Sequence, residues 1–252
     1  MWTPTFRPTT RYELVMRMTR PHRRLGRAGH ALLDFPFFYL LLSMVILLFL
    51  YPYTVSETGE VGSALRLFAW IVPVFGVYAV SDDRRLMGLA LLFGIPSVVG
   101  ALQPEDGVFP QALAMLSTLM FFGFTAVVVL TRVIRSRKVT AETIYGAISV
   151  YLLMGLTWMT AYGLLERLHP GSFNVAAAQN PDSILSSLDL LYFSFVTLTT
   201  LGYGDITPIS DAARSLAFME AITGVMYLTI LVARLVGMYA AGSGAAAGTE
   251  SR

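Results

Sequence analysis

The chain has 252 residues, of which 55% are hydrophobic and only 13% are charged, with a formal net charge of +2. A soluble domain carries roughly 25% charged residues, so this composition is that of a membrane protein and excludes an ordinary soluble one. Cysteine is absent, which excludes disulfides, thiol chemistry and cysteine metal sites. The three histidines lack ligand spacing and no catalytic constellation is visible, so we expect neither an enzyme nor a nucleic-acid-binding protein.

Residues 1–32 form a basic arm before the first apolar stretch. Its seven arginines are Arg7, Arg11, Arg17, Arg20, Arg23, Arg24 and Arg27. Such an arm is attracted to anionic lipid at the cytoplasmic face of a membrane. A signal peptide does not fit, because the apolar run that follows is too long and no small-residue cleavage site comes after it. An arginine-rich organelle presequence remains an alternative.

Six apolar stretches follow, and most are near the ~20 residues that cross a bilayer. Four of them carry no charge, namely Phe35–Ser56, Leu86–Pro104, Gly107–Thr131 and Thr143–Leu165. The other two contain charged side chains, with Arg66 in Ser63–Val80 and Glu220 in Ala213–Val236. Pro73 and Pro96 suggest kinked helices. We therefore expect an all-α membrane protein with six transmembrane helices.

The basic side chains set the expected orientation of these spans. The seven arginines of the arm fall on one side of a six-span chain together with Arg84, Arg85, Arg132, Arg135, Arg137 and Lys138. The acidic residues of the opposite loops are Glu57, Glu60, Glu105 and Asp106. Both termini should therefore be cytoplasmic.

A short helix is expected between the last two spans. It should begin between Asn180 and Ser187, where Asn, Pro, Asp and Ser supply N-caps and a first-turn proline. It should run to Thr199, and its C-terminal dipole would favour a cation nearby.

Residues 199–205 read TTLGYGD. Successive carbonyls can point at one axis only if the strand adopts left-handed as well as right-handed conformations, and glycine does so without steric cost. Gly202 and Gly204 are those positions. The carbonyls of Thr200, Leu201, Gly202 and Tyr203, with the Thr200 hydroxyl, would then form stacked oxygen cages.

With the flanking Thr199, Asp205 and Pro208, this segment resembles the selectivity filter of pore-loop potassium channels. The resemblance extends from about Thr143 to Met238 and is to the prokaryotic six-transmembrane channels of the voltage-gated-like superfamily. It implies an outer helix, a re-entrant pore helix, the filter and an inner helix, in a bacterial inner membrane. It also implies a homotetramer, because one filter strand cannot surround an ion.

The same resemblance implies the domain organisation and the ligand. Residues 33–138 would form a four-helix peripheral domain, residues 139–240 the pore domain and residues 241–252 a flexible cytoplasmic tail. K+ in the filter is the expected ion, with no organic cofactor. The tail leaves no room for a regulatory domain, so any such domain would be a separate chain.

Voltage sensors of this superfamily carry Arg or Lys at every third position within the membrane. The fourth span has no charge from Gly107 to Thr131, and Arg132 and Arg135 lie at its cytoplasmic end, where topology alone explains them. We therefore expect no strong voltage gating. A weakly voltage-dependent channel that uses these two arginines is the nearest alternative.

Several residues are expected to support the filter. Aligned with the family, Tyr192 and Phe193 take the positions of a paired-aromatic cuff. Val196 stands where some members have a Glu that pairs with the Asp after the filter, so Asp205 is expected to bond the Tyr192 hydroxyl instead.

Glu220 lies about two turns into the last span, where a charge is costly and usually has a protein partner. We expect Glu220 to brace the filter from behind through Thr197 or Ser194, and its protonation to make current pH dependent. A solvated position near the outer surface is the alternative.

Gly224 matches the hinge glycine of inner helices in the family, although close helix packing explains a glycine there equally well. Carrying over the pore-facing side of the helix from this position gives the cavity and gate residues Val225, Leu228, Thr229, Val232, Ala233 and Val236.

Two other classes of protein fit the motif less well. Potassium transporter subunits resemble four degenerate pore repeats in one chain, whereas this chain has one intact repeat. A non-selective cation channel is expected where the filter tyrosine is replaced, and Tyr203 is present.

Overall fold

The computed structural model describes residues 35–54, 71–80, 84–102, 108–136, 138–176 and 185–250. The basic arm, the acidic residues of the outer loops, Arg66, Arg137 and Asn180 lie outside these residues. So does the first part of the second predicted span.

Each of the six predicted spans contains a helix in the described part of the chain. These helices are α3 (Pro36–Thr54), α5 (Ile71–Val80), α6 (Arg84–Leu102), α7 (Val108–Arg135), α8 (Ala141–Leu168) and α10 (Asp211–Glu250). Pro96 lies inside α6, which still forms one helix. The fold is therefore mainly helical, as expected.

Three of the helices are long and apolar enough to cross a membrane, counting only the described residues. The crossing segments are Pro110–Arg135, Ala141–Leu168 and Asp211–Met238. α3 contributes a shorter apolar segment, Pro36–Leu50. The total of six crossings stays a prediction.

The helix ends follow from local capping. Thr140 is the N-cap of α8, and its side chain accepts a hydrogen bond from the backbone N–H of Thr143 at 3.2 Å. The short helix α9 (Ser187–Leu198) begins with a capping box, in which Ser186 and Asp189 each bind the other's backbone N–H. The predicted pore helix is thus confirmed as a helix, with its start and end within the expected limits.

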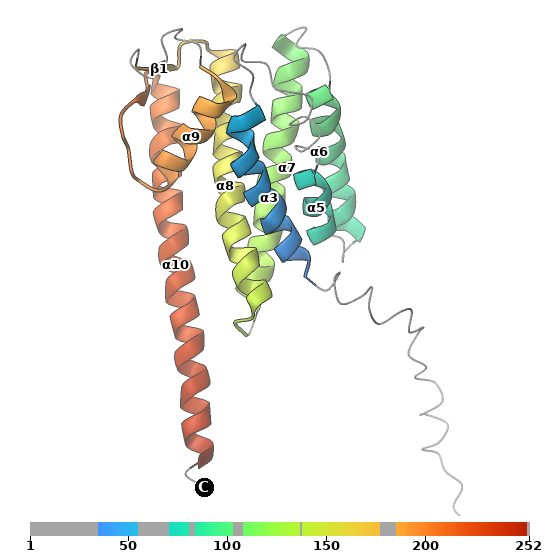
Figure 1. The fold of residues 1–252 in the computed structure, drawn as a ribbon, viewed down its shortest axis with the longest axis vertical. Helices are drawn as coiled ribbons and strands as arrows, with labels where there is room; N and C mark the ends of the chain where they lie inside the picture. Colours follow the sequence, from blue (N-terminus) through green and yellow to red (C-terminus); the bar gives the residue numbers. More distant parts are fainter. Residues whose placement is uncertain are drawn as a thin grey trace, which may run out of the picture. The chain divides into compact units, whose positions relative to one another are not determined.

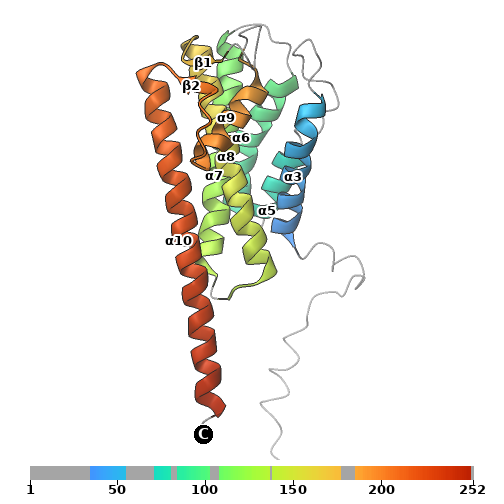
Figure 2. The same ribbon diagram turned by 60° about the vertical axis from the view of Figure 1, so that its left-hand side comes forward.

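The helices pack in chain order around α7 and α8. α6 lies along α7, α7 lies along α8, and α3 packs against both α5 and α8 (Figure 1). α9 and α10 pack against the other side of α8 (Figure 2). The core between α3, α7 and α8 includes Leu40, Met44, Val129, Val133 and Leu153, all at most 2% exposed. α8 is therefore the element that joins the first four helices to the C-terminal ones.

A two-stranded ribbon departs from the expected all-α fold. β1 (Phe173–Val175) pairs antiparallel with β2 (Ile206–Pro208), with Val175 opposite Ile206. Strands of three residues are too short to show a periodic pattern, so the sequence gave no signal for them. The ribbon ties the segment after α8 to the segment after the TTLGYGD motif.

The C-terminal end also differs from expectation. Residues 241–250 were expected to form a flexible tail, whereas α10 continues as a helix through Glu250. Alanine is the strongest helix former, and the segment AAGSGAAAG is rich in it. Its helix propensity therefore outweighs the effect of the small polar residues on which the expectation was based.

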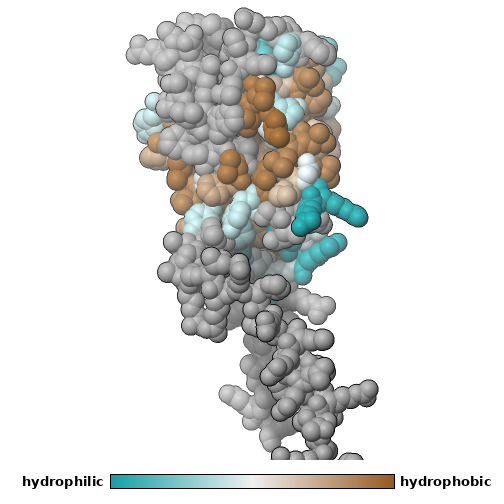
Figure 3. Space-filling view, turned by 90° about the vertical axis from the view of Figure 1, so that its right-hand side faces the viewer, coloured by the Kyte–Doolittle hydropathy of each residue, from teal (hydrophilic) through white to brown (hydrophobic). Residues whose placement is uncertain are grey.

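The side of the molecule that carries α6 exposes apolar side chains. Leu89, Leu92, Ile95 and Val99 of α6 are 42–62% exposed. Figure 3 shows hydrophobic side chains gathered on this side, with hydrophilic ones toward one end of it. Such an exposed apolar surface suits contact with lipid chains rather than water.

Candidate functional site

The segment between α9 and β2 has a backbone in which the sign of φ alternates. Thr200, Gly202 and Gly204 have φ values of 58°, 57° and 79°, in the left-handed region, whereas Leu201 and Tyr203 have no positive φ. Alternation of left- and right-handed conformations turns successive carbonyls to the same side of a strand. The backbone thus meets the requirement for a row of carbonyl oxygens.

Thr200 is the position that sequence reasoning missed. A left-handed conformation costs an L-residue roughly 1–2 kcal/mol, so it persists only where neighbouring contacts fix it. Here the Thr200 N–H donates to the Thr197 carbonyl at 2.9 Å, and the Leu201 N–H donates to the Val196 carbonyl at 2.9 Å. The end of α9 therefore holds the first residue of the strand in place.

The strand lies at the surface of the subunit. Leu201 is 55% exposed and Tyr203 is 66% exposed. A Cβ added at Gly202 or Gly204 would meet nothing within 4 Å. One chain therefore supplies one wall of any ion path and leaves the other walls open.

Asp205 is anchored beside the strand. The Tyr192 hydroxyl donates to Asp205 Oδ2 at 2.7 Å, which is the contact expected from the sequence, and the Ile206 N–H donates to Oδ1 at 3.0 Å. The Tyr192 ring also stacks on the Tyr203 ring, with centroids 6.4 Å apart and planes 3° from parallel. The hydrogen bond to Asp205 raises the pKa of Tyr192 to about 12, so the phenol remains a donor at neutral pH.

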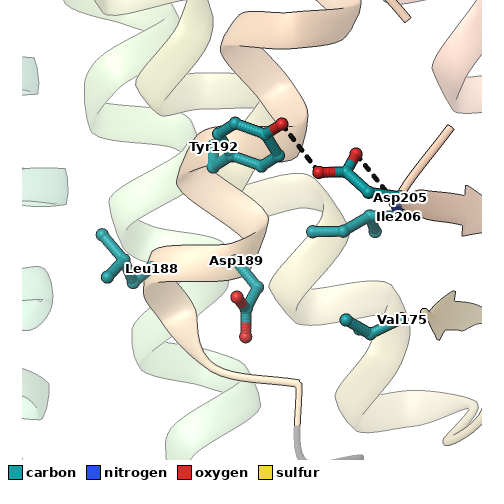
Figure 4. A pocket seen from close by; sticks show the side chains of 6 residues that line it. All are labelled: Val175, Leu188, Asp189, Tyr192, Asp205 and Ile206. Atoms are coloured by element: carbon teal, nitrogen blue, oxygen red, sulfur yellow. Dashed lines mark hydrogen bonds between the residues drawn. The ribbon is translucent and has the colours of Figure 1, made fainter. Parts of the chain in front are cut away.

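These side chains border a pocket of about 320 Å³ beside the strand. Figure 4 shows the hydroxyl of Tyr192 directed at Asp205, and the pocket is lined by Val175, Leu188, Asp189, Tyr192, Asp205 and Ile206. The Asp205 carbonyl accepts from the Ala176 N–H at 2.8 Å, next to the β1–β2 pairing. The outer end of the strand is thus held by both α9 and the ribbon.

Tyr192→Phe is expected to weaken the outer end of the strand. It removes one hydrogen bond to a carboxylate, worth about 1.5–3 kcal/mol, but keeps the ring that stacks on Tyr203. We expect sustained current to decay faster in recordings from the purified variant. Tyr53→Phe is the matched control, because Tyr53 is 77% exposed on α3, and equal decay in both variants would contradict the assignment.

The other predicted support residues have different surroundings. Phe193 packs edge-on against the rings of Tyr162 and Phe173, at 5.1 and 5.5 Å, so it faces the core and not the strand of its own subunit. Val196 is buried, and the Thr199 hydroxyl donates to the Phe195 carbonyl at 2.7 Å. Their roles as filter support stay predictions.

Glu220 is fully buried, so the alternative of a solvated position is wrong. Its Oε1 accepts from Ser194 at 2.6 Å, which is one of the two partners expected from the sequence. Its Oε2 accepts from the Tyr162 hydroxyl, which was not foreseen. Ser194 also donates to the Gly155 carbonyl at 2.8 Å. Glu220 thereby connects α10 to both α9 and α8.

Gly224 faces the end of α9. A Cβ at this position would lie 2.2 Å from the Leu198 carbonyl oxygen, closer than any side chain tolerates. α10 is one continuous helix through Gly224. The close-packing interpretation therefore has a direct structural basis, and the hinge stays a prediction.

Comparisons with known proteins agree with this geometry. A family model described as "Ion channel" matches residues 148–241. Protein LctB of Bacillus caldotenax is 30% identical over 125 residues, which are 46% of this chain and 92% of that protein. This chain belongs to the ion-channel family. The family is one of channels and not of enzymes, in agreement with the expectation from the sequence.

Other relatives of the channel match only its C-terminal part. Two pore potassium channel c of Oryza sativa subsp. japonica is 37% identical over 86 residues, 34% of this chain and 16% of that protein. A protein named voltage-gated potassium channel, from Aeropyrum pernix, is 33% identical over 72 residues, 27% of this chain and 24% of that protein. The channel thus spans less than a quarter of the length of these two relatives. No solved structure matches it.

The predicted cavity and gate residues of the channel are all exposed on the single subunit, as Val225, Leu228, Thr229, Val232, Ala233 and Val236. Residues on other faces of α10, such as Ile222 and Ile230, are about half exposed as well. Exposure alone therefore does not distinguish a pore-facing side from a side that contacts another subunit, and the gate stays a prediction.

The cytoplasmic half of the channel contains a contact that sequence reasoning missed. Arg234 of α10 donates to the Ser136 carbonyl, in the turn between α7 and α8, at 2.7 Å. The Ser136 hydroxyl donates to the Lys138 carbonyl at 2.8 Å within that turn. The two residues are 98 positions apart, so no local pattern could have indicated the pairing.

Proposed function

We propose that the chain is one subunit of a potassium-selective channel, which conducts K+ passively across a bacterial inner membrane. The observation that carries the proposal is the alternating φ at Thr200, Gly202 and Gly204 on a TLGYG sequence, because stacked carbonyl cages need both features. The names of two relatives, which are potassium channels, support the same ion.

The pore is proposed to be a homotetramer in the lipid bilayer. One strand cannot surround an ion, and four strands around one axis can. The exposed strand of the single subunit and the exposed apolar residues of α10 support this assembly. The transported K+ would contact the carbonyls of Thr200, Leu201, Gly202 and Tyr203 and the Thr200 hydroxyl.

We assign the parts of the chain accordingly. Residues 139–240 form the pore domain, residues 33–138 form a peripheral domain, and both termini lie in the cytoplasm. Tyr192, Asp205 and Glu220 support the filter, whereas Val225 to Val236 line the cavity and gate.

Ion flux into lipid vesicles tests the proposal. Purified protein in vesicles with a K+ gradient should take up K+ along that gradient, and an equal Na+ gradient should give little uptake. The pore-blocked control is the same vesicle preparation made with Gly202→Ala protein. Equal uptake of the two ions would indicate a non-selective cation channel instead.

The fourth span is proposed to lack a working voltage sensor. α7 has basic residues only in its last turn, Arg132 and Arg135. Charges at the membrane edge traverse little of the field, whereas each charge that crosses 100 mV fully contributes about 2.3 kcal/mol.

The double variant Arg132→Gln/Arg135→Gln should therefore leave the voltage dependence of open probability unchanged. The measurement is single-channel recording at stepped voltages, with Arg84→Gln as the control for lost cytoplasmic charge. A steep voltage dependence that the double variant abolishes would favour the weakly voltage-dependent alternative.

A further inference from the structure

Three oxygen–oxygen contacts lie behind the filter strand, where α8, α9 and α10 meet. Tyr162 contacts Oε2 of Glu220, and the Ser194 hydroxyl lies 2.6 Å from Oε1 and 2.8 Å from the Gly155 carbonyl oxygen. Tyr162, Ser194 and Glu220 are all 0% exposed. The cluster is therefore closed to bulk water.

Each of these contacts requires a hydrogen between its two oxygens. Tyr162 supplies one hydrogen, Ser194 supplies one, and the Gly155 carbonyl supplies none. An ionised Glu220 would leave two hydrogens for three contacts, so Ser194 would face either Glu220 or Gly155 lone pair to lone pair. A protonated Glu220 supplies the third hydrogen, and every contact is then satisfied.

The surroundings of Glu220 agree with this count. Within the described part of the chain its hydrogen-bond partners are hydroxyl groups, and it has no cationic partner. The titratable groups that face it are phenols, Tyr162 and Tyr151 from α8, while α9 offers Ser194 and β2 offers no titratable side chain. An unpaired carboxylate in such a site is strongly unfavourable.

We propose that Glu220 is a neutral carboxylic acid that donates from Oε1 to Ser194. The hydrogen bonds then run in one direction, from Tyr162 to Glu220, from Glu220 to Ser194 and from Ser194 to the Gly155 carbonyl. This chain joins the inner helix, the pore helix and the outer helix without a buried charge. Glu220 is a positioning residue, since it acts on the strand only through α9.

Alkaline conditions should remove this hydrogen. The carboxylate that remains leaves one of the three contacts without a hydrogen and places a charge behind α9. The link between α9 and α8 then weakens. The effect on current rests on the proposed function, whereas the protonation itself does not.

Infrared spectroscopy of the full-length protein in lipid tests the protonation directly. At neutral pH the wild type should show the C=O stretch of a buried carboxylic acid, and Glu220→Gln should lose it. Ser194→Ala should shift the same band, because the acid loses its acceptor. Absence of the band in the wild type overturns the proposal, whether or not the variants fold or the protein conducts.

A matched pair of variants tests the proposal through stability. The Gln amide can donate to Ser194 and accept from Tyr162, so Glu220→Gln should keep the thermal stability of the wild type. Glu166 accepts from two backbone N–H groups, Gly171 at 2.7 Å and Ser172 at 2.9 Å. Glu166→Gln must turn an amide N–H toward one of these donors and should lower the melting temperature. An equal loss in Glu220→Gln would show that both of its oxygens accept, which overturns the proposal.

Current recorded at rising pH gives the functional readout. The wild type should lose current as the pH becomes alkaline, and Glu220→Gln should keep it. If the infrared band is present but neither protein conducts, the proposed function fails and the protonation stands. If both conduct and respond equally to pH, the proposed role of Glu220 in holding the pore helix is wrong.

Discussion

Gly202→Ala is expected to abolish selective K+ current. Gly202 has a φ of 57° in the middle of the strand, and an L-residue there costs roughly 1–2 kcal/mol. A tetramer includes the substitution four times at one level of the pore, which amounts to about 4–8 kcal/mol. The strand should relax to a right-handed conformation at this position and turn a carbonyl away from the axis. Planar bilayer recording of the purified variant measures the loss.

Gly171→Ala is the matched control for this variant. Gly171 also has a positive φ, 85°, and a Cβ there would meet nothing within 4 Å, as at Gly202. It lies between α8 and β1, outside the filter strand. The backbone cost per subunit is therefore similar, but selective current should remain. Equal loss in the two variants would mean that folding, and not the carbonyl row, accounts for the effect.

Gly224→Ala is expected to disrupt the seat of α9 on α10. The added Cβ would lie 2.2 Å from the Leu198 carbonyl oxygen, which is backbone and cannot rotate away. Overpacking of this kind costs about 1–3 kcal/mol, and α10 must move away from α9 to relieve it. We expect a lower melting temperature of the assembled protein and a loss of current, because α9 holds the filter strand.

Gly237→Ala is the control on the same helix. A Cβ at Gly237 would meet nothing within 4 Å, and replacing a helical glycine by alanine stabilises a helix by about 1 kcal/mol. Its melting temperature should not fall. A Gly224→Ala protein that is as stable as Gly237→Ala but opens less often would favour the hinge interpretation over close packing.

The filter could be predicted from the sequence because its requirements are local. The glycines at 202 and 204 are needed where φ is positive, and both have that conformation. The capping box of Ser186 and Asp189 is likewise a pattern of neighbouring residues, and it placed the start of α9. Local rules of this kind need no knowledge of tertiary contacts.

The features that were missed depend on distant contacts. Thr200 is left-handed because the end of α9 fixes it, which its residue type does not indicate. Tyr162 is 58 positions from Glu220, and nothing in either segment marks the other as its partner. The side of α10 that approaches Leu198 also required the packed structure before Gly224 had an explanation.

The reversal potential with K+ on one side of a bilayer and Na+ on the other tests the central claim most directly. The measurement uses the purified full-length channel at neutral pH. A selective carbonyl filter predicts a reversal potential strongly displaced in the direction set by K+. A reversal potential near zero would contradict the claim, because the pore would then conduct both ions equally.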